Sequence, residues 1–248
     1  MKLTQAVSVI ITAFLLLPFT SCTSIHCESC ELTGNNNDES PDFNALLVRK
    51  YVSILSEPAG KAAMGSLTPL GNMLGLTAKH VITDNPVAWL DGQLTGVDII
   101  SEGADYEGPA TPNDWIQVRI NNIDISQHNY LEFGHTFHEG DVLYFAGFPG
   151  RGRNSLDAVK KCIIRGVVKS KSLPFWIHKD TVISNENIIL LSVNGNPDLS
   201  GMSGGPVAYR DPEHGWVVVG IFIGQYYTAF WHGYGVLALP EQVRPYLN

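Results

Sequence analysis

The chain has 248 residues, a mass of 27.1 kDa and a formal net charge of −8 at pH 7. This length allows one large β domain or two small ones and excludes a miniprotein held together by disulfides. Nucleic acid is disfavoured as a partner, because phosphate backbones are bound by clustered Lys and Arg and the sequence contains no such patch. With 24 glycines, 14 prolines and only 16% charged residues, the composition indicates many turns and argues against an α-helical bundle.

Residues 1–22 have the layout of a secretory signal. Lys2 precedes an apolar run from Ala6 to Leu17, and Pro18-Phe19-Thr20-Ser21 leads from there to Cys22. The run is shorter than the roughly 20 apolar residues that a membrane-spanning helix needs, and it contains Ser8 and Thr12. A signal is therefore favoured over a permanent span, and we expect the protein to be exported.

The end of this segment, Phe19-Thr20-Ser21-Cys22, resembles the lipobox of bacterial lipoproteins, although Phe19 replaces the more usual leucine. The resemblance implies that Cys22 is lipidated and anchors the protein to a membrane of the bacterial cell envelope. Ordinary secretion, with Cys22 lost or oxidised, is the alternative. Residues 23–42 are polar and predict a flexible spacer that would hold a folded domain off the membrane.

The spacer contains a CxxC pair, Cys27 and Cys30. No strand–helix unit surrounds the pair, so a thioredoxin-like redox site is not expected, and a disulfide within the tail is favoured. Zinc would need two further ligands, and only His26 lies close by in the sequence. Cys162, next to two isoleucines, is predicted to be a small buried hydrophobic residue.

From residue 51 onward, short apolar segments alternate with clusters of Gly, Pro, Asn and Asp, a spacing typical of antiparallel β structure. The predicted strands are Tyr51–Leu55, Met73–Leu76, Trp115–Ile120, Val142–Phe148, Ile163–Val168, Ile188–Val193, Val217–Ile223 and Val236–Leu239. The best helical periodicity, at Phe43–Leu55, could equally enter a strand at Tyr51. Pro240 could open one or two helical turns near the C-terminus. The sequence thus predicts an all-β fold in residues 43–248, as two small barrels or one sandwich.

One glycine-rich segment, Gly201–Pro206, flanks Ser203 with glycines on both sides. Such a turn projects the serine hydroxyl and can expose the N–H groups of Gly201 and Ser203 to hold an oxyanion. The segment also satisfies G-x-S-x-G, the nucleophile elbow of α/β-hydrolases, which must lead into a helix. Here a β-like segment, Val207–Tyr209, follows instead, and too little chain remains for an acid and a histidine after the serine.

Two earlier segments offer partners for a serine nucleophile. His80 lies at the end of the apolar segment Leu76–Ile82, and Asp114 lies at the mouth of a predicted strand. The order His, Asp, Ser is one of the orders that nucleophilic triads adopt. A serine hydroxyl becomes a strong nucleophile only when a neighbouring base takes its proton, and histidine side chains titrate near neutral pH.

Together these segments resemble the trypsin-like (chymotrypsin-fold) serine proteases, in particular the bacterial, disulfide-poor branch that includes the HtrA-like enzymes. Thr77–His80 is similar to the family's TAxH, Gly201–Pro206 to GxSGGP, and Gly140–Gly150 to the segment that opens the second barrel. The resemblance implies two six-stranded antiparallel barrels, at about residues 43–125 and 140–240, with a short C-terminal helix.

The resemblance also implies an activity, the hydrolysis of peptide bonds in a polypeptide substrate through an acyl-enzyme. Ser203 would be the nucleophile, His80 the general base and then acid, and Asp114 the residue that fixes the imidazole. Gly201 and Ser203 would supply the oxyanion hole. No cofactor or metal is implied.

The substrate pocket is less well defined by the resemblance. The position that gives trypsin its specificity falls at Pro197, with Asp198 beside it, and Ser200 and Gly224 complete the candidate pocket. Met202 stands where trypsin has an aspartate before the nucleophile, so activation by an ion pair to a newly cut N-terminus is not expected.

Three alternatives remain open at this level. Asp105 is a second candidate for the acid, because Ile116 stands where the family often has a small residue. The same scaffold could be a non-catalytic binding module, or an esterase that uses the same triad. No PDZ-like segment follows Leu239, so a full HtrA architecture is not expected.

Overall fold

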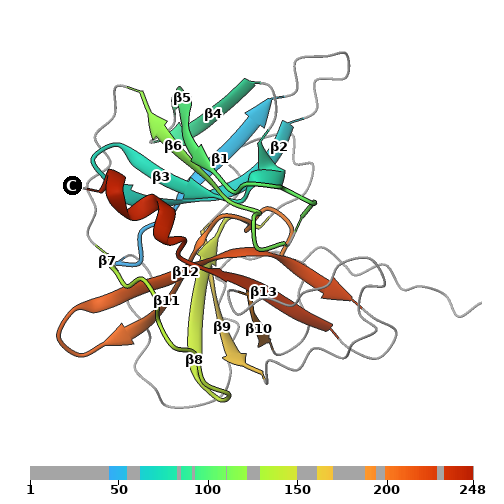
Figure 1. The fold of residues 1–248 in the computed structure, drawn as a ribbon, viewed down its shortest axis with the longest axis vertical. Coiled ribbons are helices and arrows are strands. Elements are labelled where there is room, and N and C mark those ends of the chain that lie inside the picture. The colour runs from blue at the N-terminus through green and yellow to red at the C-terminus, as the bar shows by residue number, and fades with distance from the viewer. Residues whose placement is uncertain are drawn as a thin grey trace, which may run out of the picture.

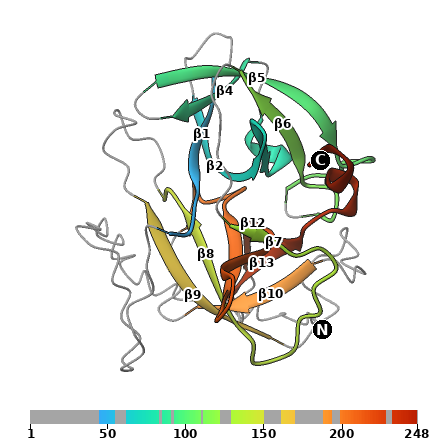
Figure 2. The same ribbon diagram turned by 90° about the vertical axis from the view of Figure 1, so that its left-hand side faces the viewer.

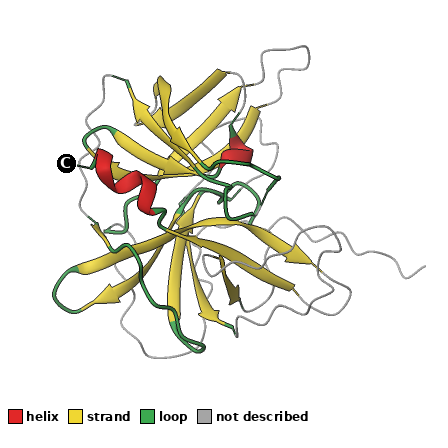
Figure 3. Cartoon of the chain, in the orientation of Figure 1, coloured by secondary structure: helices red, strands yellow, loops and turns green. Residues whose placement is uncertain are grey.

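The computed structural model describes ten stretches of the chain: residues 45–54, 62–82, 85–90, 93–109, 111–121, 129–149, 161–169, 188–193, 199–227 and 232–247. Figure 1 shows these residues as two groups of strands, one above the other, and Figure 3 shows how little helix accompanies them. The predictions for the signal, the spacer, Cys22, Cys27, Cys30, Pro197 and Asp198 lie outside the described residues.

The first group is a closed antiparallel barrel with the order β1-β2-β3-β6-β5-β4. Its strands are β1 Arg49–Ile54, β2 Ala62–Gly71, β3 Leu74–Thr77, β4 Asn85–Leu90, β5 Gln93–Glu102 and β6 Ile116–Ile120. Closure leaves no strand with an unpaired edge. The interior is filled by apolar side chains, namely Leu67, Ala78, Val81, Ala88, Leu90, Val97, Val118 and Ile120.

The second group has the strand order β11-β8-β9-β10-β13-β12-β7. Its strands are β7 Tyr130–Leu131, β8 Val142–Gly147, β9 Cys162–Val168, β10 Ile188–Ser192, β11 Pro206–Asp211, β12 Gly215–Tyr227 and β13 His232–Ala238. Because β11 also pairs with β12, six of these strands form a closed circuit. The seventh strand, β7, lies outside the circuit and pairs with β12 in parallel. Figure 2 shows β7 next to β12.

A continuous apolar core joins the two groups. It includes Leu70, Leu74 and Leu76 from the first barrel and Ala146 and Val218 from the second. Fully burying a leucine stabilises the fold by roughly 1.5–3 kcal/mol, so this shared core resists separation of the two halves. Any site formed where they meet therefore has rigid walls.

The C-terminal segment returns from the second half to the first. After β13, the 3-10 helix η3 (Glu241–Tyr246) lies against the first barrel, where Figure 1 shows it beside β3. Val243 is fully buried in the shared core, and the Asn72 side-chain amide donates a hydrogen bond to the Leu247 carbonyl. The predicted C-terminal helical turns are thus present, in 3-10 form.

The predicted all-β fold of two six-stranded barrels is confirmed, and every predicted strand segment overlaps an observed strand. Phe43–Leu55, left open between helix and strand, contains β1. The prediction did not include β2, β4, β5 and β7, and it described part of β11, Val207–Tyr209, only as β-like. β5 was missed because most of its side chains are exposed or half-buried, so its sequence lacks an apolar alternation. Across the described stretches, no helix has the length and apolar character required to cross a membrane.

Candidate active site

His80 and Asp114 are brought together by the pairing of β3 with β6. The two strands are antiparallel and Thr77 pairs with Ile116, so the residues that follow β3 lie beside those that precede β6. His80 lies in the 3-10 turn η1 (Lys79–Val81), and Asp114 is fully buried just before β6. The His80 backbone N–H donates to Asp114 Oδ1 at 3.0 Å, and His80 Nδ1 lies 2.7 Å from Asp114 Oδ2.

Two tyrosines lie within electrostatic reach of the Asp114 carboxylate. Burial, and then the charge of Asp114, raise the pKa of Tyr106 to about 12. The same two causes, in the same order, raise the pKa of Tyr226. The Lys79 ammonium lies beside this segment, 3.1 Å from Glu102 Oε2 and 5.2 Å from the centre of the Tyr106 ring.

Asp105, the alternative acid, does not contact the imidazole. Its side chain is exposed, and its backbone has a φ of 50° in the left-handed region that Asp and Asn tolerate in turns. Among the described residues, Asp114 is the carboxylate that His80 contacts.

The loop that carries Ser203 begins with a tight turn over residues 199–202. The Met202 N–H donates to the Leu199 carbonyl at 3.0 Å, and Gly201 has a φ of 97°. A positive φ at the third position defines a type II turn, which favours glycine there. The N–H groups of Gly204 and Gly205 are used within the fold, donating to Phe222 and Met202.

The N–H groups of Gly201 and Ser203 differ from those of Gly204 and Gly205. Within the described part of the chain, neither N–H donates to any acceptor. Both remain available as the donors of an oxyanion hole.

Hydrogen bonds from the first barrel hold the Ser203 loop in place. The Ser66 N–H donates to the Ser203 carbonyl at 2.7 Å, and the Thr68 hydroxyl donates to the Gly204 carbonyl at 2.8 Å. A Cβ placed on Gly65 would lie 2.6 Å from Val81 Cγ1 and 3.0 Å from the Ser203 carbonyl oxygen. Val81, which follows His80, and the Ser203 backbone therefore both pack against Gly65.

Ser203 itself is largely buried, with 8% of its surface exposed. No hydrogen bond among the described residues joins its hydroxyl to the His80 ring. Such bonds are often long in unliganded enzymes and tighten when substrate binds.

Met202 anchors the loop from the opposite side. Its side chain is fully buried in the core of the second barrel, in a cluster that includes Leu199, Phe145 and Val219. An apolar contact thus occupies the place where trypsin has an aspartate, and Met202 offers no charge for an ion pair.

Two of the four predicted pocket residues lie within the described stretches. Ser200 is the second residue of the 199–202 turn, and Gly224 pairs across strands with Gly235 beside a bulge in β12. The buried Tyr226 ring lies over this glycine pair, because a Cβ on Gly235 would be 2.5 Å from Tyr226 Cε2.

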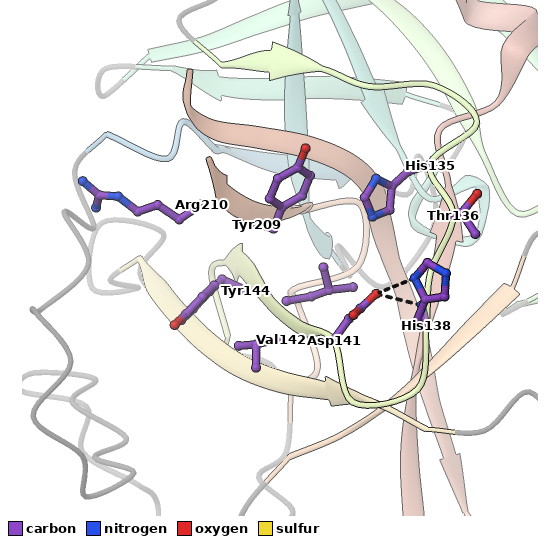
Figure 4. Close-up of a pocket in the computed structure, with 9 residues that line it drawn as sticks. His135, Thr136, His138, Asp141, Val142, Tyr144, Tyr209 and Arg210 are labelled. Atoms are coloured by element: carbon purple, nitrogen blue, oxygen red, sulfur yellow. Dashed lines mark hydrogen bonds and ion pairs between the residues drawn. The ribbon is translucent and has the colours of Figure 1, made fainter. Parts of the chain in front are cut away.

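A separate groove of about 530 Å³ lies on the second barrel, and none of the candidate catalytic residues lines it (Figure 4). Its lining residues are His135, Thr136, His138, Asp141, Val142, Leu143, Tyr144, Tyr209 and Arg210. Glu132 orders one wall, accepting a 2.8 Å hydrogen bond from the Tyr209 hydroxyl and lying 3.1 Å from His135 Nδ1. The described stretches contain no cluster of three or more His, Cys, Asp or Glu side chains able to hold a metal ion.

Fold and site geometry together define a protein of the chymotrypsin fold, with an imidazole–carboxylate pair beside a glycine-rich serine loop. No protein-family model and no curated protein sequence matches the chain. Solved structures do match, and those described next are trypsin-like serine proteases or their homologues.

The Rv3671c protease of M. tuberculosis in its active form is 14% identical, with a TM-score of 0.55 over 81% of this chain and 79% of that chain. The scabies mite inactivated protease paralogue S-I1 is 11% identical, with a TM-score of 0.62 over 86% and 97%. The HL collagenase is 16% identical, with a TM-score of 0.60 over 82% and 92%. At these identities the likeness establishes the fold alone.

Proposed function

We propose that this protein is an exported serine endopeptidase that hydrolyses peptide bonds through an acyl-enzyme. The observation that carries the proposal is the 2.7 Å contact between the buried Asp114 carboxylate and His80 Nδ1. This pair lies on the edge of the first barrel to which the Ser203 loop is hydrogen-bonded.

The geometry supports a chemical role for each group. With Nδ1–H directed at Asp114, the lone pair of His80 is on Nε2, where it can take the Ser203 proton as Oγ attacks the carbonyl carbon. The Gly201 and Ser203 N–H groups would hold the resulting oxyanion. Transfer of the same proton to the leaving amine breaks the peptide bond, and water then releases the acyl group by the reverse sequence.

The form of the 199–202 turn favours catalysis over a purely binding role. One structural neighbour is an inactivated paralogue, so the fold by itself does not decide between the two. A non-catalytic module has no need of two unoccupied amides beside a serine. Here a type II turn with Gly201 at a φ of 97° leaves those amides without intramolecular acceptors in the described residues.

Export and anchoring are part of the proposal on sequence grounds. The apolar run from Ala6 to Leu17 and the lipobox-like end at Cys22 support a lipoprotein whose catalytic domain is tethered to the bacterial envelope. Expression in a bacterium fed an alkyne fatty acid tests this directly, since wild type should become labelled and Cys22→Ala should not. Equal labelling of both would refute lipidation at Cys22.

The enzymatic proposal is tested by a fluorophosphonate probe followed by mass spectrometry of the modified peptide. We expect the adduct on Ser203 and no adduct in Ser203→Ala, with parallel loss of casein hydrolysis. An unreactive wild-type protein would select the binding module. Turnover of short acyl esters without cleavage of a diverse peptide library would select the esterase.

A further inference from the structure

Ser66 makes an unusual set of hydrogen bonds for one fully buried residue of β2. Its N–H donates to the Ser203 carbonyl at 2.7 Å, and its hydroxyl donates to the Gly201 carbonyl at 3.1 Å. The hydroxyl oxygen also accepts the Phe148 N–H at 3.0 Å. Ser66 thereby joins the first barrel to two segments of the second.

The direction of the hydroxyl is fixed by these partners. A serine hydroxyl has one proton to donate, and because its oxygen accepts from the Phe148 amide, the proton is left for the Gly201 carbonyl. There is little free space around it, since a Cβ on Gly147 would lie 2.9 Å from Ser66 Oγ. The Ser66 side chain is therefore held in one orientation.

The two carbonyls that Ser66 binds belong to Gly201 and Ser203, the residues whose amides are the candidate oxyanion donors. Gly201 adopts either sign of φ at little cost, so nothing in the residue itself fixes its amide. Type I and type II turns differ mainly in the orientation of the central peptide, here the one between residues 200 and 201. The Gly201 carbonyl belongs to the next peptide, between residues 201 and 202. By binding this carbonyl from outside the turn, Ser66 Oγ fixes the C-terminal side of Gly201, against which the 200–201 peptide is oriented.

We propose that Ser66 is a positioning residue for the oxyanion hole, with its hydroxyl holding Gly201 in the geometry that receives negative charge from the substrate. The inference deepens the proposed function and rests on it. Neither of the sequence motifs around His80 and Ser203 contains Ser66, which acts from a different strand. Its contribution is realised only in the transition state, when the oxyanion forms.

Ser66→Ala tests the inference through kcat, KM and inhibitor affinity. Removing an oxyanion donor typically costs 100-fold to 1000-fold in turnover, and a misplaced donor should cost less. We expect kcat to fall about 10-fold to 100-fold with KM unchanged within about twofold. A peptide aldehyde, which forms a tetrahedral adduct with Ser203, should bind more weakly by a similar factor, while the matching product peptide should bind as before.

Thr95→Val serves as the matched control. It removes one side-chain to backbone hydrogen bond, from the Thr95 hydroxyl to the Asn121 carbonyl, in the same barrel. It should lower stability slightly and leave kcat and aldehyde affinity unchanged. If Ser66→Ala does not fold, Ser66→Gly removes the same hydroxyl and provides the same measurements.

The outcomes separate this inference from the proposed function. A Ser66 variant that loses stability but keeps wild-type kcat and aldehyde affinity assigns a structural role only and overturns the inference, while the protease assignment stands. A wild-type protein that does not react with fluorophosphonate overturns both. A loss of kcat shared equally by Thr95→Val would also defeat the positioning role.

Discussion

Asp114 holds His80 at two points, with one carboxylate oxygen on the backbone N–H and the other on ring Nδ1. The first bond, at 3.0 Å, stops the carboxylate from rotating, and the second, at 2.7 Å, fixes the plane and the tautomer of the ring. Because Asp114 is fully buried, water does not compete for either bond. The imidazole is therefore oriented before any substrate arrives.

Replacing this carboxylate by an amide should reverse the tautomer of His80. In Asp114→Asn, the side-chain oxygen accepts the His80 N–H and the NH₂ group faces Nδ1, which must then accept. The ring proton moves to Nε2, where it blocks proton transfer from Ser203. We expect kcat to fall by about 10⁴-fold in steady-state peptide hydrolysis, with the fold retained.

Asp105→Asn is the control for this experiment. Its exposed side chain lies in a turn, and the variant should keep kcat within about twofold of wild type. A loss of activity in Asp105→Asn comparable to that in Asp114→Asn would contradict the assignment of Asp114.

The principal residues of the candidate site could be predicted because each has a local signal. His80 follows a buried strand, Asp114 precedes an apolar one, and Ser203 lies between glycines that a tight turn needs. Such signals depend only on neighbours in the sequence. They do not establish that the three residues meet, and the expectation that they do came from the resemblance to a known family.

The supporting residues had no such signal. Ser66 binds Gly201 across 135 positions of the chain, and a lone serine within an apolar strand carries no mark of such a partner. The same is true of Tyr106 and Tyr226, whose proximity to Asp114 depends on how a loop and a distant strand fold back. Long-range packing of this kind is decided by the tertiary structure, not by local preference.

Gly204 offers a test of how tightly the serine loop is packed against the first barrel. A Cβ at this position would overlap the Thr77 hydroxyl and the Ser66 carbonyl, and the backbone has a φ of 86°. We expect Gly204→Ala to lower the free energy of unfolding by about 3 kcal/mol in urea denaturation, from overlap and backbone strain together.

Gly215→Ala separates the two contributions to that loss. Gly215 has a φ of 72°, but no atom of the described residues would lie within 4 Å of a Cβ added there. Only backbone strain of about 1 kcal/mol should therefore appear. Equal losses in the two variants would mean that the loop moves away from the barrel easily.

The Tyr209–Glu132–His135 cluster beside the groove should make stability depend on pH. Burial opposes ionisation of Glu132, but hydrogen bonds from Tyr209 and His135 outweigh it and lower the pKa of Glu132. A lowered carboxyl pKa stabilises the fold above the unfolded-state pKa of about 4.3, and this stabilisation is lost as pH falls through the folded-state pKa. Glu132 is 41% exposed, so screening by solvent keeps the contribution below about 1 kcal/mol.

Tyr209→Phe removes the hydroxyl that donates to Glu132 at 2.8 Å. We expect it to lower the free energy of unfolding by about 0.5–1 kcal/mol at pH 7. The loss should be smaller at pH 3.5, which lies below the unfolded-state pKa, so that part of the stabilisation by the charged carboxylate is absent there. Denaturant unfolding at the two pH values measures the difference. A deficit of the same size at both would show that the charged form of Glu132 is not what the hydroxyl stabilises.

Cys162 should be chemically inert in the folded protein. Its side chain is 3% exposed, and burial raises the pKa of the thiol to about 11. At pH 8 only about one thiol in a thousand is then the reactive thiolate, and reagents cannot reach it without local opening. In a variant with Cys22, Cys27 and Cys30 replaced by serine, we expect reaction with a disulfide reagent at least about 100-fold slower than with free cysteine, and rapid reaction in urea. Leu94→Cys in the same background serves as the control. Leu94 is 47% exposed on β5, so the new thiol should react quickly without denaturant. Fast reaction of Cys162 in the native protein would instead mean that β9 opens readily.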